Sequence, residues 1–434
     1  MRLSRFEWDG RDPGALAAEL RALQPPLEQV SDEVATIIAD VAERGDAAVL
    51  ELDRRFTGVS RTSPLVPPKL VDGALELVPE LTEALRYAAG EIRRVAEAEA
   101  AAEGESESEG AAGQRVSMRS VPVSAAGAYV PGGRASYPSS AMMCCIPARA
   151  AGVERVAVSS PPGPDGDPDR LVLAACALAG ADDVYAMGGV QAIAALALGT
   201  ETVQPVDVIV GPGNRYVQEA KRQLFGRVGI EGIAGPSELM VALGVGANLR
   251  WAALDLCAQV EHGPDGLAVA TATEDRVLGE LEAQVRDIAD APDSTVSDGP
   301  IALVAVPSLA AAVDLANALA PEHLQLAFDD AEELAGGVET AGCVLVGPAA
   351  GTAFGDFAAG SNHVLPTGGA GRFSGPLGPR AFRRRIATVR ISPQAARELA
   401  PSAATLARAE GFPLHAESAE VRGRSAGEAE ERPD

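Results

Sequence analysis

The chain has 434 residues, which is too long for one ordinary hydrophobic core, so two to four packed units are expected. Hydrophobic residues make up 47% of the sequence and aromatic residues only 4%, a composition typical of a globular protein. The 36 Lys and Arg against 61 Asp and Glu give a net charge of −25, which argues against nucleic acid or an anionic membrane as a partner.

The start of the sequence carries no recognisable targeting signal. The first ten residues lack the apolar run of a signal peptide, and no stretch approaches the roughly 18 apolar residues of a membrane span. We therefore expect a cytoplasmic protein. The five cysteines show no Cys-x-x-Cys pair and lie in apolar stretches, so buried, reduced thiols are expected. Cys257, near His262, is the best of them for a catalytic role.

Residues 1–115 are predicted to form a helical N-terminal region with an acidic loop at its end. Apolar residues recur three and four positions apart, as at Val34, Ile37, Ile38 and Val41, which is typical of amphipathic helices. Helices are expected at 13–23, at 31–56 with a break at Gly45, and at 71–102. Residues 101–114 are polar and of low complexity, which indicates a mobile surface loop.

Strands and helices alternate from residue 116 onward, which predicts parallel sheets covered on both faces. A first Rossmann-like unit is expected over 116–238, with strands at 121–129, 155–160, 183–187 and 206–210. A second is expected over 239–376, with strands at 239–243, 267–272, 301–306, 324–328 and 343–346. The fold class predicted is therefore α/β, with two tandem Rossmann-like parallel-sheet units and a ligand cleft between them.

Residues 377–434 are predicted to return to helix and to end in a charged, disordered tail. Arg380, Arg383, Arg384 and Arg385 form a basic cluster within this segment. The cluster favours a solvated or intersubunit salt-bridge face, with phosphate binding as the alternative.

The clearest chemical signal is the pair Gln259 and His262, near the end of a predicted helix. Residues three apart on a helix share a face, and this is metal-ligand spacing. Imidazole, carboxylate and amide ligands favour zinc, with manganese or cobalt possible. Spacing alone leaves a surface or helix-capping role for Gln259 open.

Two further segments combine polar side chains in patterns typical of active sites. Glu322 and His323 are adjacent, so their side chains diverge; they could flank a substrate as two proton-handling groups or form a salt bridge at a helix end. Residues 355–366 are rich in turn formers yet carry Asp356, Asn362 and His363, the profile of a site loop.

Gly211-Pro212-Gly213-Asn214 lies between a predicted strand and a predicted helix. Such a turn suits an anion, because free backbone N–H groups and the helix dipole converge there. Tyr216 stands where a dinucleotide motif has its third glycine, so a plain tight turn remains the alternative.

With these residues in view, the whole chain resembles the histidinol dehydrogenase family, zinc- and NAD-dependent enzymes of the last two steps of histidine biosynthesis. The resemblance rests on eight stretches in the family's order between about residues 120 and 415. They are Ala-Tyr-Val-Pro-Gly-Gly, Met-Gly-Gly-Val-Gln-Ala-Ile-Ala-Ala-Leu-Ala, Gly-Pro-Gly-Asn, Ala-Gly-Pro-Ser-Glu, Ala-Gln-Val-Glu-His-Gly-Pro-Asp, Pro-Glu-His-Leu, Gly-Asp-Phe through Asn-His-Val-Leu-Pro-Thr, and Glu-Gly-Phe-Pro-Leu-His.

The resemblance implies an aldehyde-dehydrogenase-like pairing of the two units and a role for each candidate residue. One zinc ion per subunit would be bound by Gln259, His262, Asp356 and His415. The substrate would be surrounded by Ser237, Gln259, His262, His323, Asp356, His363, Glu410 and His415. NAD would contact Tyr129, Gln191 and Asn214. The enzyme would be an intertwined homodimer, in which the segment with Glu410 and His415 completes the partner's site.

The activity implied is oxidation of L-histidinol through L-histidinaldehyde to L-histidine with two NAD⁺. His323 would act as the base towards the hydroxyl group and the hydrated aldehyde, and Glu322 would activate the water. Phe357 and Ser361 depart from the family's common Tyr and Pro, but no ligand or base is lost. The alternatives are a related NAD- and zinc-dependent dehydrogenase of another polar alcohol, and a zinc hydrolase with Glu322 as general base.

Overall fold

The computed structural model describes residues 1–25, 30–76, 79–133 and 135–424. The chain divides into two compact units. Unit 1 consists of residues 1–100 and 123–382, and unit 2 consists of residues 101–122 with the chain from Arg383 onward. The four regions expected from the sequence are continuous stretches of chain, whereas each of these units combines separate segments that pack together. The boundaries of the four regions therefore stay a prediction.

The first sheet of unit 1 has five parallel strands in the order β6-β5-β4-β7-β8. They are β4 (Ala125–Tyr129), β5 (Arg155–Ser160), β6 (Asp183–Ala186), β7 (Val208–Val210) and β8 (Gly229–Ile230). The chain builds outward from β4 to β6 and then crosses to the other side of β4. This is the doubly wound order of a Rossmann fold.

Helices cover both faces of this sheet, so its central strands are apolar throughout. One face packs against α5 (Pro79–Ala102), α6 (Pro138–Ala150) and α7 (Arg170–Ala179). The other packs against α2 (Ser31–Arg44), α3 (Asp46–Thr57), α8 (Gly189–Leu198) and α9 (Arg215–Leu224). The short helix α4 (Pro68–Gly73) packs on α7. The expected break at Gly45 separates α2 from α3, since Gly45 adopts φ +55°.

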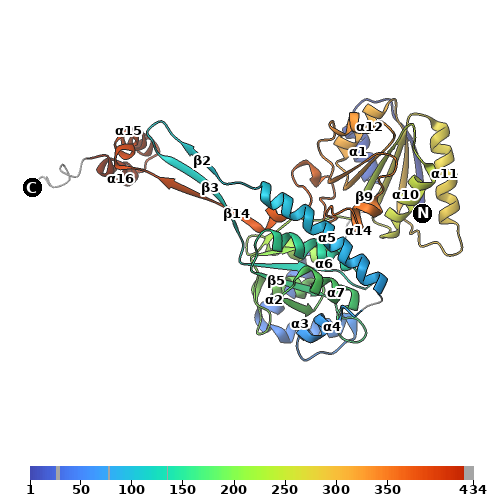
Figure 1. The fold of residues 1–434 in the computed structure, drawn as a ribbon, viewed down its shortest axis with the longest axis horizontal. Coiled ribbons are helices and arrows are strands. Elements are labelled where there is room, and N and C mark those ends of the chain that lie inside the picture. The colour runs from blue at the N-terminus through green and yellow to red at the C-terminus, as the bar shows by residue number, and fades with distance from the viewer. Residues whose placement is uncertain (26–29, 77–78, 134, 425–434) are drawn as a thin grey trace, which may run out of the picture. The chain divides into compact units, whose positions relative to one another are not determined.

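The second sheet repeats this order and adds one strand at its edge, β1-β11-β10-β9-β12-β13. Its strands are β1 (Arg2–Glu7), β9 (Glu238–Leu243), β10 (Leu267–Ala272), β11 (Pro300–Ala305), β12 (His323–Ala327) and β13 (Cys343–Val346). Helices α1 (Pro13–Arg21) and α12 (Leu309–Leu319) cover one face, and α10 (Leu249–Glu261) and α11 (Asp275–Ala289) cover the other (Figure 1). The predicted α/β fold with two tandem Rossmann-like sheets is confirmed.

The N-terminal region is not wholly helical as expected, because residues 2–7 form β1. This strand pairs in parallel with β11, from Arg2 opposite Pro300 to Glu7 opposite Ala305. It lies at the edge of the sheet and its side chains are mostly polar, so its sequence carries no apolar run that would mark it as a strand.

Unit 2 contains an antiparallel sheet where the sequence predicted a loop and a helix. Its strand order is β14-β3-β2, from β14 (Arg383–Arg390), β3 (Arg115–Pro122) and β2 (Ser106–Glu109). Residues 106–109 are therefore strand and not a mobile loop, and Arg383–Arg385 lie in a strand and not in a helix. Helices α15 (Pro393–Ala409) and α16 (Pro413–Gly423) follow. The predicted disordered tail, 425–434, lies outside the described residues.

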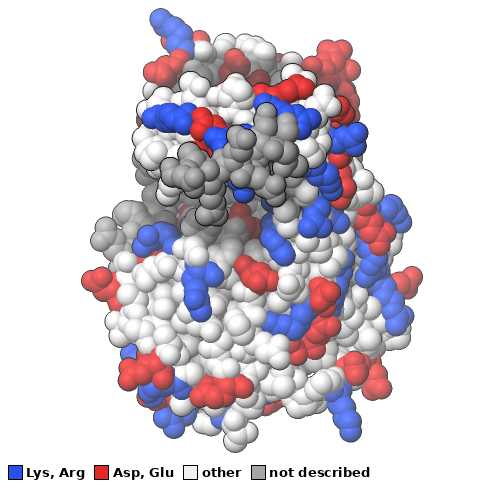
Figure 2. All heavy atoms as spheres, turned by 90° about the vertical axis from the view of Figure 1, so that its left-hand side faces the viewer, with Lys and Arg blue, Asp and Glu red and all other residues white. Residues whose placement is uncertain are grey.

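Of the predicted basic cluster, Arg383 has an acidic partner within unit 2, whereas Arg384 donates to the Pro122 carbonyl oxygen. Arg383 contacts Glu103 at 3.3 Å, and Arg390 contacts Glu107 at 3.8 Å. On the face drawn in Figure 2, basic and acidic side chains are interspersed over the surface. Exposed pairs of this kind contribute little to stability.

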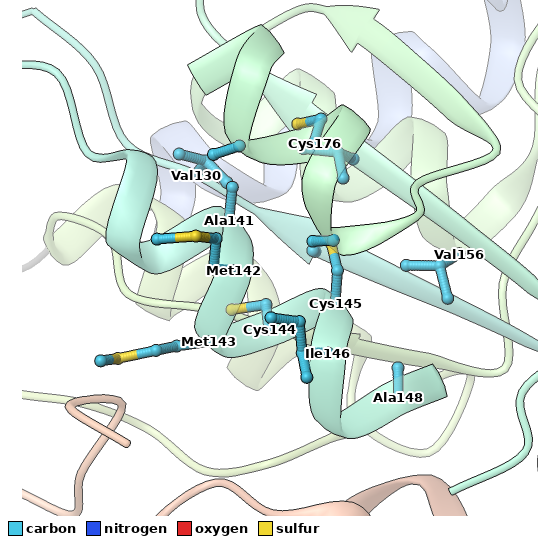
Figure 3. Close-up of a cluster of buried hydrophobic side chains, with 14 of the residues drawn as sticks. Val130, Ala141, Met142, Met143, Cys144, Cys145, Ile146, Ala148, Val156 and Cys176 are labelled. Atoms are coloured by element: carbon cyan, nitrogen blue, oxygen red, sulfur yellow. The ribbon is translucent and has the colours of Figure 1, made fainter. Parts of the chain in front are cut away.

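The cysteines are free, and four of the five are buried. Cys144, Cys145 and Cys176 lie in the apolar cluster between α6, α7 and the first sheet (Figure 3). Burial raises the pKa of the Cys145 thiol to about 12 and that of Cys257 to about 11. A raised pKa makes each thiol a poorer nucleophile at neutral pH, which argues against a catalytic Cys257. In the part of the chain that the structure describes, no helix has the length and apolar character needed to cross a bilayer.

Candidate active site

The expected acid–base pair lies where β12 begins, at the amino end of the second parallel sheet. Glu322 directly precedes the strand, His323 is its first residue, and both are buried. The Nδ1 atom of His323 is 3.9 Å from Glu322 Oε2, too far for a hydrogen bond. The two side chains point in different directions, as those of adjacent extended residues do. Glu322 contacts Glu238, and His323 contacts Asp356.

The turn between α12 and β12 sets this position. Helix α12 ends at Leu319, and Ala320 adopts a left-handed conformation with φ +48° and ψ +62°. Pro321 cannot continue the helix, because it lacks an N–H donor. A non-glycine residue in this conformation is strained by roughly 1–2 kcal/mol. The strain sits directly beside the two candidate catalytic residues, where such conformations are often found.

Glu322 is held by the neighbouring strand and has an unusual acidity. Its Oε2 accepts a hydrogen bond of 2.8 Å from the backbone N–H of Glu238, the first residue of β9. Burial raises the pKa of Glu322 to about 7, and the nearby His323 offsets only part of that rise. A carboxyl group poised near neutrality can both take and give a proton.

His323 faces Asp356, which comes from the short helix α14 (Thr352–Phe357). His323 Nε2 lies 3.2 Å from Asp356 Oδ1, but the angles are not those of a hydrogen bond, so the contact is electrostatic. Burial alone would lower the pKa of His323, yet the contact with Asp356 and the charge of Glu322 outweigh it and leave that pKa raised. Burial likewise opposes ionisation of Asp356, but His323, His363 and His262 together lower its pKa.

Two of the expected metal ligands occupy the end of α10, at the same edge of the sheet. Gln259 is buried in the last turn, and His262 is the exposed C-cap residue. Helix α10 returns from the carboxyl end of β9 to the amino end of β10, so its last turn reaches the level of Glu322. His262 is close enough to Asp356 to lower the pKa of that carboxyl group.

Several buried polar atoms at this edge have no hydrogen-bond partner. They are Gln259 Nε2, His323 Nδ1 and Asp356 Oδ1. Unpaired polar atoms are unfavourable in a protein interior, so these atoms fit a bound polar group. Of the three, only Asp356 Oδ1 is an expected metal-ligand atom, since an amide binds a cation through its oxygen and not through its nitrogen. Within the described ranges, no three His, Cys, Asp or Glu side chains are grouped closely enough to hold a metal by themselves.

The predicted site segment, 355–366, begins within α14 and continues in a loop of residues 358–369, called the site loop below, which contacts α6 on the first sheet. His363 is half-buried, with Nδ1 3.2 Å from the Asp356 carbonyl oxygen and Nε2 3.2 Å from Ser140 Oγ on α6. Asn362 Nδ2 donates to the Met143 carbonyl oxygen at 2.7 Å. Burial lowers the pKa of His363, which favours a neutral imidazole.

The remaining substrate candidates are divided between the units. Ser237 directly precedes Glu238 and accepts a hydrogen bond at its carbonyl oxygen from Leu267 N, at the edge where Glu322 lies. Glu410 is the C-cap of α15, and His415 is exposed on α16, with its ring 5.5 Å from that of Phe412. Both belong to unit 2, so the four expected metal ligands are distributed over the two units.

The three expected NAD contacts lie at the carboxyl edge of the first sheet. Tyr129 ends β4, Gln191 is in the first turn of α8 after β6, and Asn214 caps α9 after β7. The chain changes sides between β4 and β7, and such a switch point is where doubly wound sheets bind nucleotides. Asn214 Oδ1 accepts from Tyr216 N and Val217 N at 3.0 and 3.2 Å, which fixes the start of α9.

The turn after β7 is supported by a buried ion pair that the sequence did not reveal. Lys221 is fully buried and donates to Glu231 Oε1 at 2.7 Å and to the Gly211 carbonyl oxygen at 3.2 Å. Glu231 Oε1 also accepts from Gly211 N at 2.7 Å. Gly211 has φ +117°, and a Cβ atom there would lie 2.1 Å from the Tyr129 carbonyl oxygen, so glycine is required.

Another pair behind the acid–base residues also escaped the sequence analysis. Arg21 of α1 donates to Glu238 through its two terminal guanidinium nitrogens, with Nη2 3.3 Å from Oε2, and Nη2 also donates to the Leu319 carbonyl oxygen. Glu238 stands in the Ala-Gly-Pro-Ser-Glu stretch and could have been selected there. Arg21 had no signal, because its partner lies 217 residues away.

Two Rossmann-like sheets, one with a switch point of the kind that binds nucleotides and one with the buried Glu322 and His323, are the architecture expected of an NAD-dependent oxidoreductase. The sequence model of the histidinol dehydrogenase family matches residues 22–423. The chain belongs to the histidinol dehydrogenase family.

Individual relatives are similar to this protein over almost the whole length of the chain. Histidinol dehydrogenase of Pseudomonas syringae pv. syringae is 42% identical over 404 residues, which covers 91% of this chain and 90% of the relative. That of Aromatoleum aromaticum is 42% identical over 427 residues, covering 95% and 97%. The crystal structure of histidinol dehydrogenase from Elizabethkingia anophelis is similar with a TM-score of 0.88 at 28% identity, covering 97% of this chain and 98% of that chain.

Proposed function

We propose that the protein oxidises L-histidinol through L-histidinaldehyde to L-histidine, with two NAD⁺ as successive hydride acceptors and one zinc ion per subunit. The observation that carries the proposal is the buried pair Glu322 and His323 beside Asp356. Both steps of such an oxidation release protons, and this pair provides two separate groups able to accept them.

His323 is assigned as the base towards the substrate hydroxyl and the hydrated aldehyde. Its Nε2 faces Asp356, whereas its buried Nδ1 has no hydrogen-bond partner among the described residues. Nδ1 is therefore the atom free to take the proton. The carboxylate of Asp356 stabilises the imidazolium that results, which is the physical reason for the raised pKa of His323.

Glu322 is assigned to the water that adds to the aldehyde. The Glu238 N–H holds Oε2, so the proton of the water would go to Oε1. Because burial raises the pKa of Glu322 to about 7, the carboxylate is a stronger base than an exposed one.

Gln259, His262, Asp356 and His415 would hold the zinc ion. When bound, the ion would supply a fixed positive charge that grips the substrate's amine and imidazole. Ser237, His363 and Glu410 would line the substrate. Because Glu410 and His415 belong to unit 2, we propose a homodimer in which unit 2 of each subunit completes the partner's site.

Tyr129, Gln191 and Asn214 would contact NAD at the carboxyl edge of the first sheet. We also propose that the enzyme works in the cytoplasm, in keeping with the biosynthetic role of its family. A substrate other than histidinol, a different polar alcohol, would keep the same acid–base chemistry.

The test is to incubate the purified, zinc-loaded protein with L-histidinol and NAD⁺ and to count NADH formed per histidine. Two NADH per histidine are expected, and removal of zinc by a chelator should abolish turnover until zinc is restored. One NADH per product, or turnover only with other alcohols, would overturn the proposal. A matched assay with L-histidinaldehyde isolates the second step.

A further inference from the structure

Asp53, in helix α3, is hydrogen-bonded to Gln191, one of the proposed NAD contacts. Its Oδ1 accepts hydrogen bonds from Gln191 Nε2 at 2.8 Å and from Gly188 N at 3.3 Å. Asp53 is 4% exposed and Gln191 2% exposed, so the pair is built into the interior. The two residues are 138 positions apart in the chain.

This contact determines which end of the Gln191 amide is hydrogen-bonded to Asp53 and which end is left for a ligand. An ionised carboxylate only accepts hydrogen bonds, so the atom facing Asp53 must be the amide nitrogen. The amide oxygen, Oε1, therefore points away from Asp53. It is buried and has no hydrogen-bond partner among the described residues. A buried acceptor without a donor is unfavourable unless a ligand supplies one.

The surroundings restrict the kind of donor. Gln191 follows Val190 in the first turn of α8, and both side chains are buried. Each ribose of NAD carries two free hydroxyl groups that both need partners. A flat base ring with one exocyclic NH₂ group is better suited to a buried acceptor, because it has a single donor group to satisfy.

We propose that Asp53 is a positioning residue that makes Gln191 a hydrogen-bond acceptor, and that the group it receives is the exocyclic NH₂ of one of the two bases of NAD. This inference rests on the proposed role of Gln191 in NAD binding. Asp53 itself does not touch the nucleotide. By orienting the Gln191 amide, Asp53 determines that the nucleotide must offer a hydrogen-bond donor at this position.

Two nucleotide analogues separate the two possible donors. The 3-acetylpyridine analogue replaces the carboxamide NH₂ by a methyl group, and the hypoxanthine analogue replaces the adenine amino group by a carbonyl oxygen. Dissociation constants are measured by fluorescence titration of the zinc-loaded protein with NAD⁺ and each analogue. We expect one analogue to bind about tenfold or more weakly than NAD⁺, since it leaves a buried acceptor unpaired.

The decisive variant is Asp53→Leu, which has a similar shape and no acceptor. Asp53→Asn would not serve, because the Gly188 N–H would keep the remaining carbonyl oxygen facing Gln191. In Asp53→Leu, Gln191 is free to present either end of its amide, so the tenfold preference for NAD⁺ over the discriminated analogue should fall to about onefold. Gln191→Met, which cannot accept a hydrogen bond from the NH₂ group, should also remove the preference and serves if Asp53→Leu does not fold.

The matched control is Asp46→Asn on the same helix, where the side chain contacts Thr200 and not Gln191. It should keep the wild-type preference. The inference is overturned if the wild-type protein discriminates against neither analogue, or if folded Asp53→Leu retains the full preference. Failure of the proposed function would show separately, as absence of NADH formation from histidinol by the wild-type protein.

Discussion

The backbone N–H of Glu238 donates to Oε2 of Glu322 over 2.8 Å, which ties the start of β9 to the residue before β12. The Glu238 side chain in turn binds Arg21 of α1, and its Oε1 accepts from Gly368 N of the site loop at 3.2 Å. One buried residue thus connects the N-terminal helix, the site loop and the proposed base.

Arg21→Met should destabilise the protein by about 3–5 kcal/mol, because it leaves the buried carboxylate of Glu238 without its cation. The change in the free energy of unfolding can be measured by urea titration. Adding Glu238→Gln in the same chain should recover most of the loss, since no unpaired charge then remains. A loss below about 1 kcal/mol in the single variant would show that Glu238 is not held as a buried anion.

The acidity of Glu322 predicts the pH dependence of the aldehyde step. Its pKa is raised to about 7 by burial, so the carboxylate form needed to activate water becomes populated as pH rises through 7. The rate of histidinaldehyde oxidation should therefore increase between about pH 6 and 8. Initial rates of NADH formation across this range measure it.

Glu322→Gln is the matched variant for that profile, because it keeps the shape and the acceptor oxygen but cannot take a proton. We expect a fall of about 10²- to 10⁴-fold in aldehyde oxidation, with zinc content unchanged. A variant that oxidises the aldehyde at the normal rate would remove Glu322 from the mechanism.

The two sheets could be predicted from the sequence because their strands are buried on both faces. Runs such as residues 239–243 and 267–272 are almost wholly apolar, and β9 and β10 begin and end within one residue of the expected bounds. Strands β1 and β14 escaped prediction because they are polar and pair with partners far along the chain. Local patterns hold no information about such pairing.

The residues of the candidate site likewise divide into those that the sequence could predict and those that it could not. Glu322, His323, Asp356 and His363 stand out by residue type, and the structure brings them together. Asp53, Arg21 and Lys221 act through contacts with side chains or backbone that only the fold brings near. An aspartate or arginine on the polar side of a helix resembles any solvated residue until its partner is known.

Lys221→Met should weaken NAD binding and lower stability together. The variant leaves the half-buried Glu231 carboxylate without its cation, with an expected loss of about 1–3 kcal/mol, and it frees the carbonyl of Gly211 at the start of the nucleotide turn. The KM for NAD⁺ should rise at least several-fold while the KM for histidinol stays the same. Lys69→Met, at the chain's other lysine, is exposed and should change neither quantity. An unchanged KM for NAD⁺ in folded Lys221→Met would contradict a role for this turn in nucleotide binding.

Asp53 makes the stability of the protein depend on pH in a direction opposite to that of a paired surface carboxylate. Burial raises its pKa from 3.8 to about 6, so the folded state binds the proton more tightly than the unfolded state does. The stabilisation is fully present below about pH 4 and is lost as pH rises through 6, by roughly 2–3 kcal/mol. Asp53→Asn cannot ionise and should lack this loss. Urea unfolding of both proteins at pH 4.5 and 7.5 gives the comparison. If the free energy of unfolding changed equally with pH in the wild-type protein and in Asp53→Asn, folding would not raise the pKa of Asp53. The ionised carboxylate would then be stabilised in the folded protein as well as it is by water in the unfolded chain.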